Sequence, residues 1–210
     1  MTSPLSKQPI GSNAPDARTR LRSTFEPLST TAHPSGWESL WSQDFLPWDK
    51  GFPSPALVDL LGSHAELLGS PLLPSNEANE SNGKRDENGK EGRNKDGKRR
   101  KKALVPGCGK GYDVLLLAAA GYDAFGLEAA PTALREARAF EELVNKGGLE
   151  GEKAEVYRVR DERVGRGSVT WLEGDFFDEA SVGGRKFDLI YDYTVSSFSF
   201  LLSLLLSVSF

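Results

Sequence analysis

The chain has 210 residues, a length that suits one domain with appendages, and its composition is globular but polar, with 38% hydrophobic and 27% charged residues. One cysteine excludes internal disulfides, and with two histidines it supplies too few ligands for a structural zinc site, so we expect no metal and a cytoplasmic location. The net charge of −4 is unevenly distributed along the chain. Residues 75–102 carry ten Lys/Arg and six Asp/Glu, so the rest of the chain has 16 basic and 24 acidic side chains, a net charge of −8. This acidic main body argues against nucleic-acid binding.

The first 35 residues are rich in Ser, Thr and Pro and show no hydrophobic period, so we predict a disordered leader over 1–35. They lack the apolar core of a secretory signal, and we expect no membrane partner. Three arginines among scattered hydroxyl residues leave an organelle transit peptide as the alternative: Arg18, Arg20 and Arg22.

Aromatic residues mark the next segment. Trp37 and Trp41 are four residues apart and therefore share one face of a short helix, which Pro47 should end. A second helix is predicted over 55–61, with a serine as N-cap and a proline at its first position. We predict that residues 36–74 form a helical cap, whose tryptophans either belong to the core or cover a ligand: Trp37, Trp41 and Trp48.

Residues 75–102 contain 16 charged residues, five Asn, four Gly and one apolar side chain, Ala78. No hydrophobic core can form from this composition, so we predict a disordered charged insertion. Its basic end, residues 98–102, is either the solvated end of a linker or a nuclear-import or polyanion-binding sequence.

From residue 103 onward, short apolar runs alternate with helical patterns. Strands are predicted at 103–106, 124–127, 169–172 and 187–193, with helices at 112–120 and 131–146 and a further candidate strand at 155–159. This alternation indicates a parallel sheet with right-handed crossovers. We therefore predict an α/β, doubly wound, Rossmann-like domain over 103–194, of which the N-terminal half is present.

A glycine-rich turn follows the first predicted strand. Gly107, Gly109 and Gly111 permit a sharp turn and close approach to a ligand. Their G-x-G-x-G spacing is that of S-adenosyl-L-methionine (SAM) methyltransferases, whereas the third glycine of a dinucleotide site would fall at Tyr112, which disfavours a nicotinamide oxidoreductase. Glu128 lies 21 residues after Gly107, where a strand-end carboxylate can accept both hydroxyls of a ribose, unless it is simply a solvated acid.

Other candidate residues follow the later strands, at the edge of the sheet where ligands bind. Asp175 either accepts a hydrogen bond from an adenine amine or caps a turn, and Phe176 would pack on the adenine ring. Tyr193 ends the last predicted strand at the same edge. Cys108 is interpreted as a small residue that fills the turn, since no histidine lies near it in sequence to make it a nucleophile.

Five runs together resemble one known family: GWESLWSQDFLPWDKGFPSPAL, ALVPGCGKGYD, GLEAAP, GDFF and FDLIYDYT. They are similar to the thiopurine S-methyltransferase superfamily, and within it to the fungal and plant thiol (thiocyanate, halide) methyltransferases, over about 36–74 and 103–194. The family more often has Asp at the position of Glu128. The resemblance implies cofactor contacts from the following residues, with Glu128 on the ribose, Asp175 and Phe176 beside adenine and Tyr193 near the methyl group: Trp37, Trp41, Trp48, Gly107, Gly109, Glu128, Asp175, Phe176 and Tyr193.

The same resemblance implies a SAM-dependent enzyme that transfers a methyl group to a small thiol, thiocyanate or halide and is a monomer in its full-length form. A soft nucleophile would attack the methyl group in line, and positioning in a dry site would supply most of the acceleration. No general base or other catalytic residue is therefore assigned.

The tail departs from the family pattern. Residues 195–210 contain only Ser, Phe, Leu and Val, where family members continue with further strands and helices. We interpret this aberrant apolar tail as translated intron; it is too short for a spanning helix, although a tail-anchor fragment is an alternative. An apolar sheet edge at 189–191 would then be unpaired and aggregation-prone. The alternative function is accordingly a truncated, non-catalytic chain with at most weak SAM binding.

Overall fold

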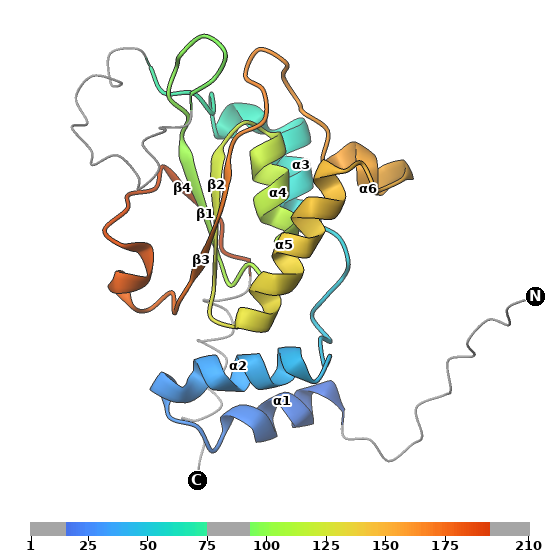
Figure 1. The fold of residues 1–210 in the computed structure, drawn as a ribbon, viewed down its shortest axis with the longest axis vertical. Helices are drawn as coiled ribbons and strands as arrows, with labels where there is room; N and C mark the ends of the chain where they lie inside the picture. Colours follow the sequence, from blue (N-terminus) through green and yellow to red (C-terminus); the bar gives the residue numbers. More distant parts are fainter. Residues whose placement is uncertain (1–15, 75–92, 194–210) are drawn as a thin grey trace, which may run out of the picture.

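The fold is that of a computed structural model in which residues 16–74 and 93–193 are described. Four parallel strands form one sheet in the order β3-β2-β1-β4 (Figure 1). The strands are β1 (Lys102–Pro106), β2 (Asp123–Glu128), β3 (Val169–Glu173) and β4 (Leu189–Ile190). The predicted α/β fold with a parallel sheet is therefore confirmed.

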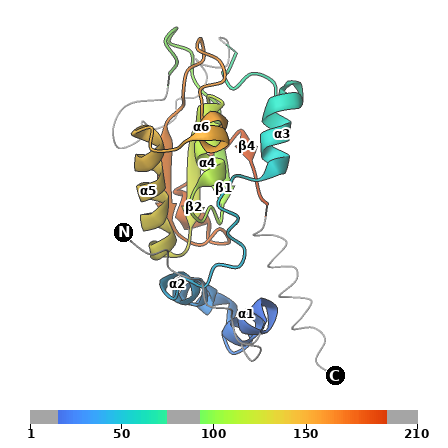
Figure 2. The same cartoon turned by 90° about the vertical axis from the view of Figure 1, so that its right-hand side faces the viewer.

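One face of the sheet is covered by helices. The first two crossovers contain α4 (Tyr112–Ala119) and α5 (Pro131–Asn145), and Figure 2 shows both in front of the strands. Every residue of α4 from Val114 to Ala119 is buried, as expected for a helix that is apolar on all sides. Alternate residues of β1, Ala103 and Val105, pack beneath this helix in the main core.

The opposite face is covered by the connection from β3 to β4. Leu104 and Phe125 point to this side and pack with Val182 and Phe187 of that connection, which includes the 3-10 helix η4 (Glu179–Val182). The first two crossovers and the third therefore lie on opposite faces, so the sheet is doubly wound and its order reverses between β1 and β4. Ligands bind at such switch points, beyond the carboxyl ends of the strands.

The N-terminal helices divide into two groups. Helices α1 (Ala17–Phe25) and α2 (His33–Ser42) lie together below the sheet in Figure 1, at the end where α5 begins, with η1 (Thr30–Ala32) between them. Helix α3 (Pro55–Ser63), followed by η2 (Ala65–Leu67), instead lies beside α4, and its Leu57 and Leu61 belong to the main core. The predicted cap over 36–74 is thus only partly a cap, because α3 is a core helix.

The predicted disordered leader is wrong over its second half. Asp16 caps α1 by accepting a hydrogen bond from the Thr19 amide at 2.7 Å. Phe25 is 1% exposed, and its ring lies 4.6 Å from that of Trp37. A single buried aromatic residue produces no period in the sequence, which explains the error. Residues 1–15 lie outside the described residues.

The predicted disordered insertion is also wrong over its last part. Residues 93–101 form a turn with an antiparallel bridge between Arg93 and Arg99, and a second bridge joins Arg100 to Leu72. Arg100 is only 7% exposed, so the basic run at 98–102 is not simply the solvated end of a linker. Residues 75–92 lie outside the described residues.

Three further boundaries differ from the predictions. A helix, α6 (Gly151–Val156), takes the place of the candidate strand at 155–159. Strand β4 has two residues rather than seven, and the chain before and after it is irregular. Helix α2 ends at Ser42, well before Pro47, because Asp44 adopts a left-handed conformation with a φ of 52° and Phe45 donates to the Leu40 carbonyl, as at a helix C-cap.

Within residues 16–74 and 93–193, no helix combines the length and apolarity that crossing a bilayer requires.

Candidate cofactor site

The glycine turn connects the carboxyl end of β1 to the start of α4. Gly107, Gly109 and Gly111 have φ angles of 57°, 52° and 76°, in the left-handed region that glycine enters without strain. The amide of Cys108 donates to the Leu127 carbonyl at 3.2 Å, which joins the turn to the end of β2. The backbone conformation expected from the three glycines is therefore confirmed.

Glu128 is buried at the end of β2. Its Oε2 accepts a hydrogen bond from the Gly109 amide at 3.0 Å, and its Oε1 accepts from Ala129 at 2.8 Å and Ala130 at 3.0 Å. Burial raises the pKa of Glu128, the three backbone N–H groups oppose this rise, and the negative charge of Glu38 adds to it. With 7% exposure, Glu128 is not the solvated strand-end acid that the sequence left open.

The tryptophans of α2 and the following loop form a cluster of their own. Trp41 is buried against Ala130 and Ala133 at the start of α5, with Trp37 and Trp48 partly buried around it. The rings of Trp37 and Trp48 meet edge to face, with 5.4 Å between their centroids. This cluster is separate from the main core.

Trp41 also reaches the glycine turn. A Cβ built on Gly109 would lie 3.4 Å from its ring. The structure therefore brings together the predicted site residues Trp37, Trp41, Trp48, Gly109 and Glu128.

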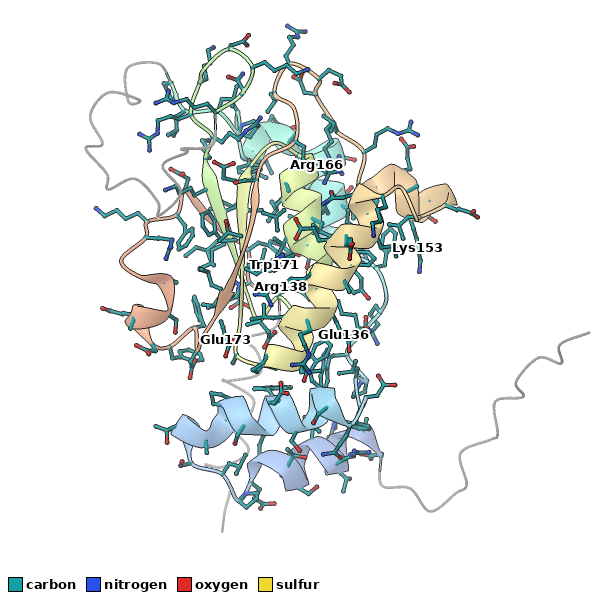
Figure 3. All side chains as sticks on the ribbon, in the orientation of Figure 1. Glu136, Arg138, Lys153, Arg166, Trp171 and Glu173 are labelled. Atoms are coloured by element: carbon teal, nitrogen blue, oxygen red, sulfur yellow. The ribbon has the colours of Figure 1, made fainter. Side chains whose placement is uncertain are left out.

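A charged group that sequence reasoning missed joins the tryptophan loop to the glycine turn. Lys110 Nζ lies 2.8 Å from Asp49 Oδ2 and 3.1 Å from Glu136 Oε2 of α5. Figure 3 shows Glu136 near the end of α5 that faces α2. Burial alone would lower the pKa of Lys110, but the hydrogen bonds and charges of both acids raise it. The sequence offered one signal for this contact: an acid, Asp49, follows Trp48, and a base, Lys110, lies within the glycine turn 61 residues later.

Trp171 of β3 is a second residue that sequence reasoning missed. Its Nε1 donates to Glu141 Oε2 of α5 at 2.7 Å, and Figure 3 shows it beside this helix. Its ring lies against Gly126, its partner in the parallel register, and against Gly111. Gly111 of the glycine turn and Gly126 of β2 therefore make room for the Trp171 ring.

The segment after β3 lies next to Glu128, because the Gly174 amide donates to the Glu128 carbonyl at 3.0 Å. Asp175 Oδ1 accepts from the Phe177 amide at 3.0 Å, the turn-capping role that the sequence left open. Phe176 packs on the core of the opposite face. Tyr193 is 61% exposed, and no described contact joins it to the glycine turn.

Cys108 does not have the environment of a nucleophile. Burial raises the pKa of its thiol, and the charge of Glu128 raises it further, so the thiol stays protonated. Within the described residues, no group of three or more His, Cys, Asp or Glu side chains is arranged to hold a metal ion.

A doubly wound sheet with a glycine turn after β1 and a buried acid at the end of β2 defines a domain of the nucleotide-binding α/β class. The family model described as Thiopurine S-methyltransferase (TPMT) matches residues 92–196. The chain therefore belongs to the thiopurine S-methyltransferase family, as its motifs indicated.

Plant relatives agree with this assignment. "Probable thiol methyltransferase 2" from Arabidopsis thaliana is 30% identical over 174 residues, which are 82% of this chain and 53% of the relative. "Thiocyanate methyltransferase 1" from the same plant is 27% identical over 79% of this chain and 50% of the relative, and its namesake from Brassica oleracea is 27% identical over 80% and 51%. The chain thus spans about half the length of the curated relatives it matches.

One solved structure is also similar. It comes from work on the conversion of a disulfide bond into a thioacetal group during echinomycin biosynthesis. It is 21% identical, covers 79% of this chain and 48% of its own, and has a TM-score of 0.46.

Proposed function

We propose that this chain binds SAM between the glycine turn and the tryptophan cluster and acts in methyl transfer to a small thiol, thiocyanate or halide. The observation that carries the proposal is the meeting of three separate segments: Glu128 accepts from the Gly109 amide, and Trp41 covers the same glycine. The names of the plant relatives support the acceptor class. We further propose that the protein acts as a cytoplasmic monomer.

The residues of the site are compatible with SAM. A carboxylate has about four lone-pair positions, and three of those on Glu128 are taken by backbone N–H groups, so one position on Oε2 can accept from a ribose hydroxyl. Two acids, Glu38 and Glu128, lie close enough for their charges to interact. Their negative charge, together with aromatic faces of the tryptophan cluster, favours a cationic ligand.

The remaining assignments follow the family pattern. Asp175 uses Oδ1 for its turn, and we assign its Oδ2 to the adenine amine, with Phe176 beside the ring. Gly107 lets the backbone approach the ligand. We place Tyr193 near the methyl group.

When bound, SAM supplies an electrophilic methyl group on a sulfonium sulfur. The work of the chain is then to bind, orient and exclude water: Glu128 holds the sugar, and Trp37, Trp41 and Trp48 cover the site. Attack by a soft thiolate or halide removes positive charge and needs little proton transfer, so no residue is assigned as a general base. Positioning and a dry site are the main contributions.

The test is cofactor binding followed by turnover. We expect S-adenosylhomocysteine (SAH) and SAM, but not NAD, to raise the melting temperature, and label from methyl-labelled SAM to appear on a small thiol, thiocyanate or iodide. Glu128→Ala should abolish the thermal shift, whereas Glu142→Ala, on an exposed part of α5, should retain it. Protection by NAD alone would contradict the proposal. Binding without turnover would support the non-catalytic alternative instead.

A further inference from the structure

The first turn of α5 lacks a capping side chain of its own. The residue at the N-cap position is Ala130, which has no side-chain hydrogen bond to offer, and Pro131 follows it without an N–H group. The next amide, that of Thr132, donates to Glu38 Oε2 at 2.9 Å, and the Thr132 hydroxyl donates to Glu38 Oε1 at 2.5 Å. A carboxylate from α2, 94 residues earlier in the chain, therefore caps this helix.

The same turn is also held by Glu128. Glu128 accepts from the amides of Ala129 and Ala130, and Glu38 accepts from that of Thr132. Because Pro131 has no N–H group, these two acids share all the backbone donors from Ala129 to Thr132. Any movement of Glu38 therefore acts on the backbone that orients Glu128.

Glu38 also lies on the helix that carries two tryptophans of the cluster. It lies on α2 between Trp37 and Trp41, and Trp41 packs on Ala130 and Ala133 of the helix that Glu38 caps. The contact of Trp41 with Gly109 requires α2 to stay in register with α5. The two hydrogen bonds from Thr132 to Glu38 join α5 to α2 and help to hold this register.

We infer that Glu38 is a positioning residue of the cofactor site. By capping α5 from α2, it holds the tryptophans over the glycine turn and fixes the backbone that orients Glu128. This inference rests on the proposed function for the identity of the ligand, but the positioning itself concerns contacts within the chain.

The experiment compares Glu38→Ala, on α2, with a variant that removes the N-cap of the neighbouring helix α1. Asp16→Ala removes a cap bond from the Thr19 amide of α1, a helix that contacts α2. Both changes should lower stability, Glu38→Ala by more, because it removes two part-buried hydrogen bonds whereas Asp16→Ala removes one exposed bond. Well below the melting temperature both proteins are folded, so a loss of stability alone leaves the affinity for SAH unchanged.

We expect Glu38→Ala to weaken SAH binding, measured by titration calorimetry, about five- to tenfold, the equivalent of one lost cap. Asp16→Ala should bind SAH like the unmodified chain. Glu38→Gln keeps one oxygen that can accept from the Thr132 amide and should bind SAH nearly as tightly as the unmodified chain. This variant tests the inference if Glu38→Ala does not fold. Equal SAH affinity in Glu38→Ala and the unmodified chain would overturn the inference.

Amide hydrogen exchange separates this result from a failure of the proposed function. Glu38→Ala should speed exchange at Gly109, Ala130 and Thr132, and Asp16→Ala should not. If the unmodified chain does not bind SAH, the proposed cofactor is wrong, yet faster exchange at Gly109 would still support positioning by Glu38. Unchanged exchange at Gly109 and Ala130 would overturn it.

Discussion

The indole ring of Trp171 fills the space into which a side chain at Gly111 would project: a Cβ built on Gly111 would lie 2.2 Å from the nearest ring atom. The Trp171 ring is held in place by its hydrogen bond to Glu141 and by Gly126 beneath it. The last glycine of the turn is therefore needed for packing between β3 and α4 as well as for its left-handed backbone, with a φ of 76°.

Gly111→Ala should therefore destabilise the protein through two effects. Gly147 offers a matched control, because it has a similar φ of 68° but no atom within 4 Å of a built Cβ. We expect Gly147→Ala to lower the free energy of unfolding by about 1 kcal/mol, from backbone strain alone. Gly111→Ala should lower it by about 1–3 kcal/mol more, because Trp171 must move. Urea unfolding of both variants measures the difference, and equal losses would show that the ring gives way freely.

The two roles of Gly111 illustrate what the sequence could predict. The strands β1 and β2 and the helices α4 and α5 were predicted to within one residue at each end, because the apolar runs and glycine stops that define them are local. The glycine spacing likewise indicated the turn and the acid at the end of β2. The ring of Trp171 was not predicted, because the residue that fills a glycine's space lies 60 positions away.

The missed contacts of the site have the same cause. Glu38 and Thr132, or Asp49 and Lys110, are unremarkable polar residues until the fold brings them together. Helix α1 was missed because it is attached by one buried residue, Phe25, which gives no repeating pattern. Local pattern thus predicted the elements of the sheet, and tertiary contact determined how the N-terminal helices attach to it.

The buried position of Glu128 has a consequence for stability against pH. Its pKa is raised above the ordinary 4.5, so between the two values the folded chain binds more protons than the unfolded chain. Stability contributed by this group therefore falls as pH rises through that window. Glu128→Gln lacks this titration. The stability advantage of the unmodified chain over the variant, measured as the difference in free energy of unfolding, should therefore fall as pH rises above 4.5. Urea unfolding at a series of pH values measures this difference, and parallel curves would contradict the effect of burial.

Lys110 should contribute to stability through the two acids that it joins. Lys110→Met leaves Asp49 and Glu136 without their cation, and we expect a loss of about 1–2 kcal/mol, since all three groups are only partly screened by solvent. Lys146→Met is the control: its pair with Glu142 is 71% and 66% exposed, so it should change stability by less than about 0.5 kcal/mol. Similar losses in the two variants, measured by urea unfolding at neutral pH, would show that the Lys110 pairs add nothing beyond a surface ion pair.

The titration of Lys110 and Asp49 predicts how the stability loss in Lys110→Met depends on pH. The pKa of Lys110 is raised above 10.5, so its contribution is present below that value and is lost as pH rises through the raised pKa. For Asp49, burial would raise the pKa, but Lys110 and the Gly51 amide lower it below 3.8, so its contribution is lost as pH falls through the lowered value. The stability difference between the unmodified chain and Lys110→Met should be constant at neutral pH and shrink at both extremes.

The basic run at 98–102 provides a test of how far the charged insertion is part of the fold. Arg100 donates to the carbonyls of Gly121 at 2.9 Å, Val164 at 2.7 Å and Gly165 at 3.2 Å, which joins three segments at the end of the sheet opposite the candidate cofactor site. Arg100→Ala leaves these acceptors without their donor, and we expect a loss of about 2–3 kcal/mol. Arg100→Lys should recover only part of it, because an ammonium group lacks the planar fork of a guanidinium.

Lys98 is the matched control, because it is an exposed cation two residues earlier in the same run. Lys98→Ala should change the free energy of unfolding by less than about 0.5 kcal/mol, as is usual for surface substitutions. Thermal and urea unfolding of the three variants would measure these differences. If Arg100→Ala costs no more than Lys98→Ala, the run behaves as the solvated end of a linker after all. If the expected difference is found, this run belongs to the folded domain, and a substitution that neutralises the whole run would destabilise the protein as well as remove its charge.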